Sequence, residues 1–233
     1  MTALRFWKGA DRLYDRVLMA VLVVILLIVC YCMYDNYYVY SHTLNESLLK
    51  YKPNTPGYVA EDSPITEDMV AWLTVDGTNI DYPVMQGSDN IKYLNTDPYG
   101  NYSLSGSIFL DSRCSPDLSD SYLLVYGHHM EYGKMFGALD EFLDRDYLSS
   151  HRTGTLMVGR RGEKTYGLSL FGAMRVSEKE GAVFDIGSGD IISFLSDNED
   201  LLLSEPEGRI LALSTCSEGD SVSRIVVFCR ILE

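Results

Sequence analysis

An uncharged stretch near the N-terminus constrains this chain more than any other feature. Residues 17–34 are eighteen consecutive residues without a charged side chain. Folded as a helix at about 1.5 Å per residue, they span roughly 27 Å, close to the hydrocarbon core of a bilayer. A cleaved signal peptide has a shorter apolar region that ends in small residues, whereas this stretch ends in Met33 and Tyr34. Residues 17–34 are therefore predicted to be an uncleaved transmembrane signal anchor.

The charges on either side of this stretch predict its orientation. Four basic residues precede it, namely Arg5, Lys8, Arg12 and Arg16. Because Lys and Arg mark the cytoplasmic side of a span, residues 1–16 are expected in the cytoplasm and residues 35–233 outside the cell membrane. The exported part holds 15 basic and 31 acidic residues, a net charge of −16. This charge argues against nucleic acid as a partner, since a phosphate binder needs a basic face.

The rest of the chain divides into a stalk and a body. Residues 35–65 are predicted to be a stalk that continues as helix to about Lys52 before four helix-breaking residues, Pro53, Pro56, Gly57 and Pro64. Helices are predicted in the body at 66–73 (with Thr66 as N-cap), 134–148 and 188–203. Strands are predicted at 79–86, 105–111, 122–126, 154–160, 165–176, 209–216 and 223–233. Residues 66–233 are therefore expected to form a mainly β domain, most simply a closed barrel with short connecting helices.

A cysteine and an arginine lie eight positions apart at the ends of the last two predicted strands. The apolar run 209–216 ends in Ser214, Thr215 and Cys216, and Arg224 opens the next run after a short polar turn. A lone cysteine is more often a small buried apolar residue. As a nucleophile it needs a nearby cation or base, because a thiol with a pKa of about 8.5 is only slightly ionised at neutral pH. Arg224 offers a permanent charge and several N–H donors suited to an oxyanion.

Two adjacent histidines follow the apolar run 122–126. They stand in the segment Tyr126-Gly-His-His-Met130. Strand alternation places His128 and His129 on opposite faces, so only one of them can serve a site shared with Cys216. A zinc site is a weak alternative, because adjacent residues seldom bind one ion and no further ligands stand at the usual spacing. No carboxylate is marked out to orient the histidine, which indicates a site unlike the triad of papain-like proteases.

The other four cysteines point to no chemistry. Cys30 and Cys32 fall within the uncharged stretch. Cys114 and Cys229 could form a disulfide, and spacing alone leaves that open.

Several segments together resemble the sortases, the cell-wall transpeptidases of Gram-positive bacteria. The resemblance is carried by Leu213-Ser-Thr-Cys216, by Arg224 after a short turn, and by Tyr126-Gly-His128. The segments 72–86 and 106–111 are similar to the opening of the class B sortase core, and class B members also carry a helix before the cysteine strand, like that expected at 188–203. The resemblance covers about residues 66–233.

This resemblance implies a fold, a reaction and a set of roles. It implies an eight-stranded sortase barrel with no required cofactor or metal. Cys216 would be the nucleophile, His128 the general acid and base, and Arg224 the group that positions the substrate and stabilises the oxyanion, with Thr215 and Ser214 as substrate contacts. The enzyme would cleave a C-terminal sorting signal of a secreted protein through a Cys thioester and pass the protein to an amine.

Three alternatives stay open at this point. The amine could belong to a peptidoglycan cross-bridge or to a pilin lysine, as in the few class B pilus polymerases. The chain could be a degenerate sortase that binds without turnover, although Cys216, His128 and Arg224 are all present. It could also be an exported cysteine protease in which water resolves the thioester. The segment Asp97-Pro98-Tyr99 has the composition of a class C sortase lid, and its place in the chain favours a turn.

Overall fold

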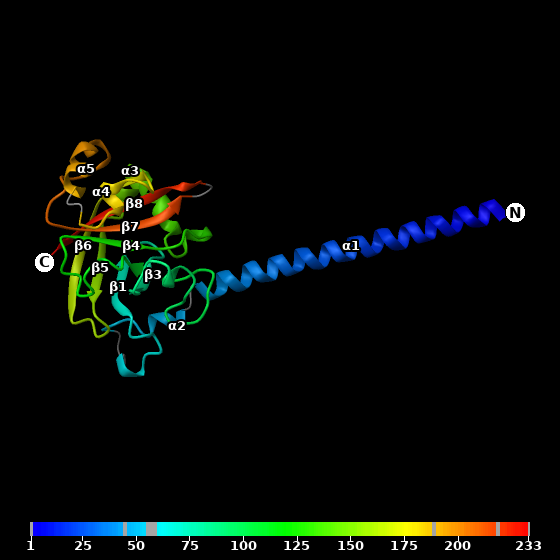
Figure 1. Cartoon of the computed structure of the whole chain (residues 1–233), viewed down its shortest axis with the longest axis horizontal. Coiled ribbons are helices and arrows are strands. Elements are labelled where there is room, and N and C mark those ends of the chain that lie inside the picture. The colour runs from blue at the N-terminus through cyan, green and yellow to red at the C-terminus, as the bar shows by residue number, and fades with distance from the viewer. Residues whose placement is uncertain (1, 44–45, 55–59, 188–189, 218–219, 233) are drawn as a thin grey trace. The chain divides into compact units, whose positions relative to one another are not determined.

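The computed structural model describes residues 2–43, 46–54, 60–187, 190–217 and 220–232. The chain divides into two compact units, Met1–His42 and Thr43–Glu233 (Figure 1). Three predictions fall partly outside the described residues: the helix breaks at Pro56 and Gly57, and the start of the helix expected at 188–203.

The first unit is one long helix, α1 (Thr2–Thr43). Its segment Leu13–Tyr34 is 22 residues long, has a mean hydropathy of 3.0 and buries none of its surface within the protein. At about 1.5 Å per residue such a segment is long enough to cross a bilayer. The segment contains the predicted span 17–34, which makes α1 a candidate membrane helix. A second, four-residue helix, α2 (Glu46–Leu49), lies in the region expected to be stalk.

Eight strands of the second unit close into a barrel, as predicted. The strands are β1 (Met69–Val75), β2 (Asp81–Met85), β3 (Ile108–Leu110), β4 (Tyr122–Tyr126), β5 (Thr153–Val158), β6 (Lys164–Ser177), β7 (Arg209–Ser217) and β8 (Asp220–Leu232). Their order around the barrel is β1-β2-β3-β4-β7-β8-β6-β5. The pairs β2–β3 and β4–β7 are parallel, and the other pairs are antiparallel.

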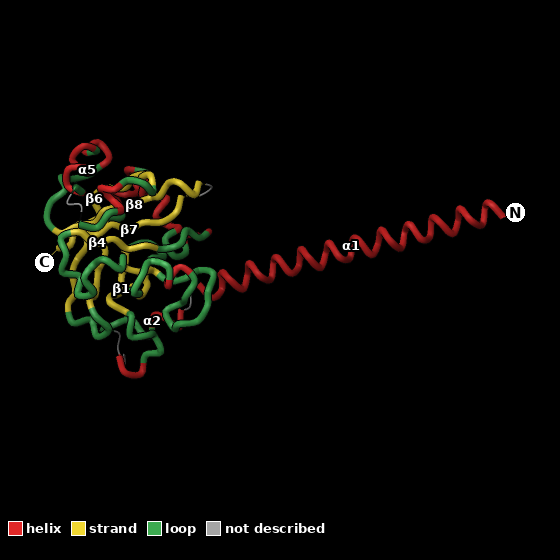
Figure 2. The backbone as a smooth tube through the Cα atoms, viewed as in Figure 1, coloured by secondary structure: helices red, strands yellow, loops and turns green. Residues whose placement is uncertain are grey.

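The strands β4, β7 and β8 are apolar on both faces, which explains their unbroken hydrophobic runs. Alternate residues such as Leu123, Leu213 and Val227 fill the barrel interior. Residues between them, such as Leu124 and Phe228, pack outward in a second cluster with two helices. These helices are α4 (Gly181–Phe184) and α5 (Ile191–Asp197). Helix α5 lies beyond the strands in Figure 2. A sheet buried on both faces needs no polar alternation.

The helix predicted at 66–73 is wrong, because residues from Met69 onward form β1. This strand pairs with β2 on one side and β5 on the other. Trp72 and Leu73 are both fully buried, on opposite faces of the strand. Thr66 caps no helix, and its backbone N–H donates to Pro98 O instead. Ladder hydrogen bonds and burial on two faces therefore outweigh a short helical pattern.

The helices predicted at 134–148 and 188–203 exist in shorter pieces. The first is a 3₁₀ helix, η4 (Gly137–Leu143), followed by α3 (Arg145–Ser150). Asp144 separates them, because its side chain accepts hydrogen bonds from the N–H groups of Asp146 and Tyr147 and so caps α3. The second is α5 followed by the 3₁₀ helix η5 (Glu199–Leu201). Three further 3₁₀ turns are η1 (Ala60–Asp62), η2 (Lys92–Leu94) and η3 (Glu131–Gly133).

Two smaller predictions can be checked as well. Residues 98 and 99 form a turn after β2, as expected for Asp97-Pro98-Tyr99. A proline within a strand predicts an edge or a bulge. Pro83 pairs with Trp72 of β1, whereas the ladder to β3 begins only at Val84. The missing N–H of Pro83 thus falls where β2 has a single neighbouring strand.

Candidate active site

The last two strands bring the positions of Cys216 and Arg224 together. In the antiparallel pair of β7 and β8, Cys216 stands directly opposite Arg224, and the register shifts immediately after Cys216. The expectation of neighbouring strand ends is therefore confirmed for the backbone. The side chain of Cys216 lies outside what the structure describes.

A cleft of about 400 Å³ opens on this part of the barrel. Four of the five predicted site residues line it: His128, Ser214, Thr215 and Arg224. The remaining lining residues are Asn90, Leu94, Phe109, Tyr126, Gly127, Glu178, Lys179 and Phe184. Strand alternation explains part of this grouping. Ser214 and Arg224 stand an even number of positions from the residues of β7 and β8 that pack outward, so they lie on the same face of the sheet.

His128 is held at the cleft by contacts on both sides of its backbone. Its own carbonyl accepts a hydrogen bond from Phe136 N at 3.0 Å, and the preceding Gly127 N donates to Ser214 O at 3.1 Å. Gly127 has no room for a side chain, since a Cβ atom there would lie 2.4 Å from Ile108 Cδ1. The glycine of the Tyr-Gly-His sequence thus allows the chain after β4 to pack closely against Ile108 while it stays hydrogen-bonded to β7.

Among the residues that the structure describes, the imidazole of His128 contacts a backbone carbonyl and no carboxylate. Its Nε2 lies 2.7 Å from Leu94 O. A carbonyl oxygen can only accept, so Nε2 donates in this contact and carries the proton. The second ring nitrogen, Nδ1, is then the one free of a proton when the ring is neutral. This agrees with the absence of a marked carboxylate in the sequence.

Arg224 is half-buried at the cleft and faces an acidic partner. Its Nη2 lies 3.4 Å from Glu178 Oε2, and 29% of the arginine side chain is exposed. Glu178 N donates to Val222 O, which ties the segment after β6 to β8. An arginine so placed keeps its charge and offers N–H donors to a group in the cleft.

Two hydroxyl groups in the cleft wall have no hydrogen-bond partner within the described part of the chain. They belong to Ser214 and Thr215, whose residues are 1% and 2% exposed. A buried hydroxyl without a partner is destabilising. Both residues directly precede Cys216 in β7.

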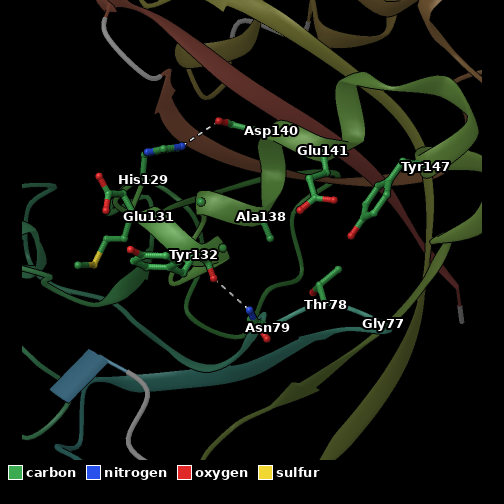
Figure 3. Close-up of a pocket in the computed structure, with 13 residues that line it drawn as sticks. Gly77, Thr78, Asn79, His129, Glu131, Tyr132, Ala138, Asp140, Glu141 and Tyr147 are labelled. Carbon is green, nitrogen blue, oxygen red and sulfur yellow. Dashed lines mark hydrogen bonds and ion pairs between the residues drawn. The ribbon is translucent and has the colours of Figure 1, made fainter. Parts of the chain in front are cut away.

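His129 turns away from the cleft into a separate pocket of about 610 Å³ (Figure 3). Its Nε2 pairs with Asp140 Oδ2 at 2.9 Å. Three acidic side chains line this pocket, from Glu131, Asp140 and Glu141. The predicted separation of the two histidines onto opposite faces is therefore confirmed. Among the described residues, no group of three His, Cys, Asp or Glu side chains is arranged to hold a metal ion.

Cys114 and Cys229 are free and buried in the barrel core. Burial raises the pKa of the Cys114 thiol to about 11. Burial also raises the pKa of the Cys229 thiol far above its ordinary value. Both thiols are thus protonated at neutral pH and behave as small apolar side chains. The disulfide left open by their spacing is not formed in the structure.

Sequence reasoning missed several cleft residues. Asn90, Leu94, Glu178, Lys179 and Phe184 come from loops or short helices in two separate stretches of the chain, 90–94 and 178–184. Only Asn90, which follows the segment 72–86, and Leu94 lie near a recognised motif. The remaining three carry no pattern that could have singled them out.

Comparison with known proteins identifies relatives of the barrel unit. The family model described as Sortase domain matches residues 73–232. The chain is 29% identical over 181 residues to Sortase B of Staphylococcus aureus, covering 72% of each protein. It is 42% identical over 89 residues to Sortase B of Listeria monocytogenes, a match to 38% of this chain and only 36% of that protein.

Solved structures give the same result. The structure of Clostridium perfringens Sortase B is 32% identical with a TM-score of 0.61, covering 71% of this chain and 94% of that one. A Streptococcus pyogenes class B sortase involved in pilus biogenesis is 34% identical with a TM-score of 0.62, covering 72% and 94%. The observed strand order is therefore that of a known barrel type.

Proposed function

Because this chain belongs to the sortase family and to its class B, we propose that it is a membrane-anchored cysteine transpeptidase that transfers secreted proteins to the cell wall. The substrate would be a C-terminal sorting signal, and the acceptor an amine of a peptidoglycan cross-bridge. The observation that carries the proposal is the cleft, which both His128 and Arg224 line and which lies beside the strand position of Cys216.

The first half of the reaction makes a thioester. The Cys216 thiolate attacks the carbonyl carbon of the sorting signal, and the carbonyl oxygen becomes an oxyanion. Arg224 donates hydrogen bonds to this oxygen, which stabilises the developing charge. The C–N bond then breaks, and His128 gives a proton to the departing amine.

The second half reverses these roles. An acceptor amine attacks the thioester carbon, His128 takes a proton from it, and the Cys216 thiolate leaves as a new amide forms. The hydroxyl groups of Ser214 and Thr215 would contact the bound peptide. Water could replace the amine, which would give hydrolysis as a side reaction.

We further propose an arrangement in which residues 1–16 are cytoplasmic, 17–34 span the membrane, 35–65 form a stalk and 66–233 form the extracellular catalytic domain. The basic residues of the N-terminal segment support this orientation. The uncharged part of α1 supports the span.

A second candidate function is pilus assembly, in which a pilin lysine is the acceptor. The similarity to the Streptococcus pyogenes class B sortase involved in pilus biogenesis favours it. A binding protein without turnover is a third possibility, and the presence of Cys216, His128 and Arg224 argues against it.

The experiment uses the full chain in detergent micelles with a library of peptides. Mass spectrometry would detect cleavage alone, transfer to a cross-bridge amine, or transfer to a lysine peptide. We expect cleavage at one peptide motif and transfer to the cross-bridge amine. Cys216→Ala should reduce turnover below detection, since loss of the nucleophile in such sites costs about a millionfold in rate. Unimpaired turnover by Cys216→Ala would rule out the mechanism, and preference for the lysine peptide would favour pilus assembly.

A further inference from the structure

A buried carboxylate lies beneath the cleft and takes no part in the proposed chemistry. Asp111 follows β3, and its side chain is 0% exposed. The Nε and Nη2 atoms of Arg113 donate to its two oxygens at 2.9 and 2.8 Å. Asn90 Nδ2 donates at 2.9 Å and the Tyr126 hydroxyl at 3.1 Å. Asp111 is thus a buried acceptor shared by three side chains.

Asp111 stays ionised in this setting. Burial raises the pKa of its carboxyl, but the hydrogen bonds and charge of Arg113, together with the Tyr126 hydroxyl, outweigh burial and hold the pKa below its ordinary value. Burial also raises the pKa of the Tyr126 phenol, so this hydroxyl remains a donor. The network therefore keeps its hydrogen-bond directions across the neutral range.

The partners of Asp111 connect it to three separate walls of the cleft. Asn90 comes from the loop after β2, and Tyr126 ends β4 two residues before His128. Arg113 carries the connection to a third wall, because its Nη2 donates to Phe184 O at 2.7 Å and its Nη1 lies 3.3 Å from Asp185 Oδ1. Asn90, Tyr126 and Phe184 all line the cleft, whereas Asp111 and Arg113 do not.

We propose that Asp111 and Arg113 are positioning residues that set the distance between the cleft walls and so determine how a peptide is bound. The proposal rests on the proposed function, since it names what shapes the substrate cleft of that enzyme. Stability alone is a poor reason for such a pair, because the cost of removing the Asp111 carboxylate from water offsets much of its attraction to Arg113. The hydrogen bonds of Asp111 and Arg113 instead join three segments that are distant in sequence, at Asn90, Tyr126 and Phe184.

Replacing Asp111 or Arg113 should weaken substrate binding more than it disturbs the reacting groups. In Asp111→Asn the amide keeps the shape of the carboxylate, but its NH₂ group cannot accept from Arg113 or Tyr126. We expect the KM for the cleaved peptide to rise about tenfold, with kcat changed less than about threefold. Arg113→Ala should act in the same direction, and its exposed location makes unfolding a smaller concern, since 44% of the side chain is accessible.

A matched control is Arg145→Ala. Arg145 also binds two backbone carbonyls, Asp200 O at 3.0 Å and Leu202 O at 3.1 Å, but it does not line the cleft. Its loss should leave KM unchanged. In all variants, the rate at which iodoacetamide modifies Cys216, followed by peptide mass spectrometry, should stay within about twofold of wild type. A parallel change in that rate would overturn the proposal, because it would mean that the reacting groups had moved.

Hydrogen exchange provides a test that needs no substrate. In the full chain, the amides of Phe184 and Asp185 donate to Glu180 O and Gly181 O at the end of α4. Arg113→Ala should increase exchange in residues 182–187 about tenfold, and Arg145→Ala should not. Arg113→Lys should give an intermediate value, because one ammonium group cannot reach Asp111 and Phe184 O in the same geometry.

The outcomes separate the two proposals. If wild type processes no peptide, the proposed function fails, and the exchange data still decide whether Arg113 holds the wall at Phe184. If wild type is active and both Asp111→Asn and Arg113→Ala keep KM within about twofold, the positioning role is refuted.

Discussion

The two adjacent histidines face different surroundings, and the contrast shows which surroundings suit catalysis. His128 borders a cleft in which the other charged lining residues that the structure describes are Glu178, Lys179 and Arg224. His129 borders a pocket whose other charged lining residues are all acidic. The Nε2 of His128 meets a backbone carbonyl, whereas the Nε2 of His129 meets the Asp140 carboxylate.

This difference matters for proton transfer. The Asp140 carboxylate holds the ring of His129 in one orientation. The ring of His128 instead contacts a backbone carbonyl at the wall of the cleft. The His129–Asp140 pair is thus suited to fixing the chain that follows β4, and the His128 side suits acid and base chemistry.

The largest test of this comparison is to remove each histidine in turn. His128→Ala should reduce kcat/KM for the cleaved peptide by about 10²–10⁴-fold, the usual range for a general acid or base. His129→Ala should change it by less than about threefold, because its side chain lies in the other pocket. Steady-state kinetics on both variants would measure this. Equal losses of kcat/KM in the two variants would contradict the difference between the two histidines and leave the identity of the acid and base open.

The next effect concerns the arginine of the cleft. Arg224→Ala should reduce kcat by about 10²–10³-fold if Arg224 stabilises the oxyanion. Arg230→Ala is the matched control, because Arg230 lies on the same strand and pairs with Glu207 away from the cleft. Its kcat should stay close to that of wild type. A loss in Arg224→Ala that appears only in KM would instead make Arg224 a binding residue.

The comparison also explains which parts of the site could be predicted from sequence. The strand ends at Tyr126 and Cys216 were recognisable because β4 and β7 are unbroken apolar runs followed by polar residues. Alternation then separated His128 from His129. The cleft walls at Asn90 and Phe184 could not be predicted, since the side chains that link them, Asp111 and Arg113, come together only in the folded barrel.

The fold shows the same limit. Seven of the eight strands were predicted to within a few residues, whereas the number eight came from the resemblance to the sortases. The helix expected at 66–73 failed because a short amphipathic pattern cannot show that β2 and β5 lie on either side of it. The helix expected at 134–148 was interrupted by one side chain, Asp144, acting as a cap.

The smallest effect is expected from the partner of His129. Asp140→Asn removes the charge that faces the imidazole but leaves an amide oxygen able to accept from Nε2. The pair is partly exposed, with 18% and 29% of the two side chains accessible. We expect the free energy of unfolding to fall by less than about 1 kcal/mol, typical of a partly exposed ion pair, as measured by urea denaturation. The kcat/KM should not change, because the pocket is separate from the cleft. A loss of activity comparable to that of His128→Ala, at unchanged stability, would mean that the two sides of this strand end act as one site.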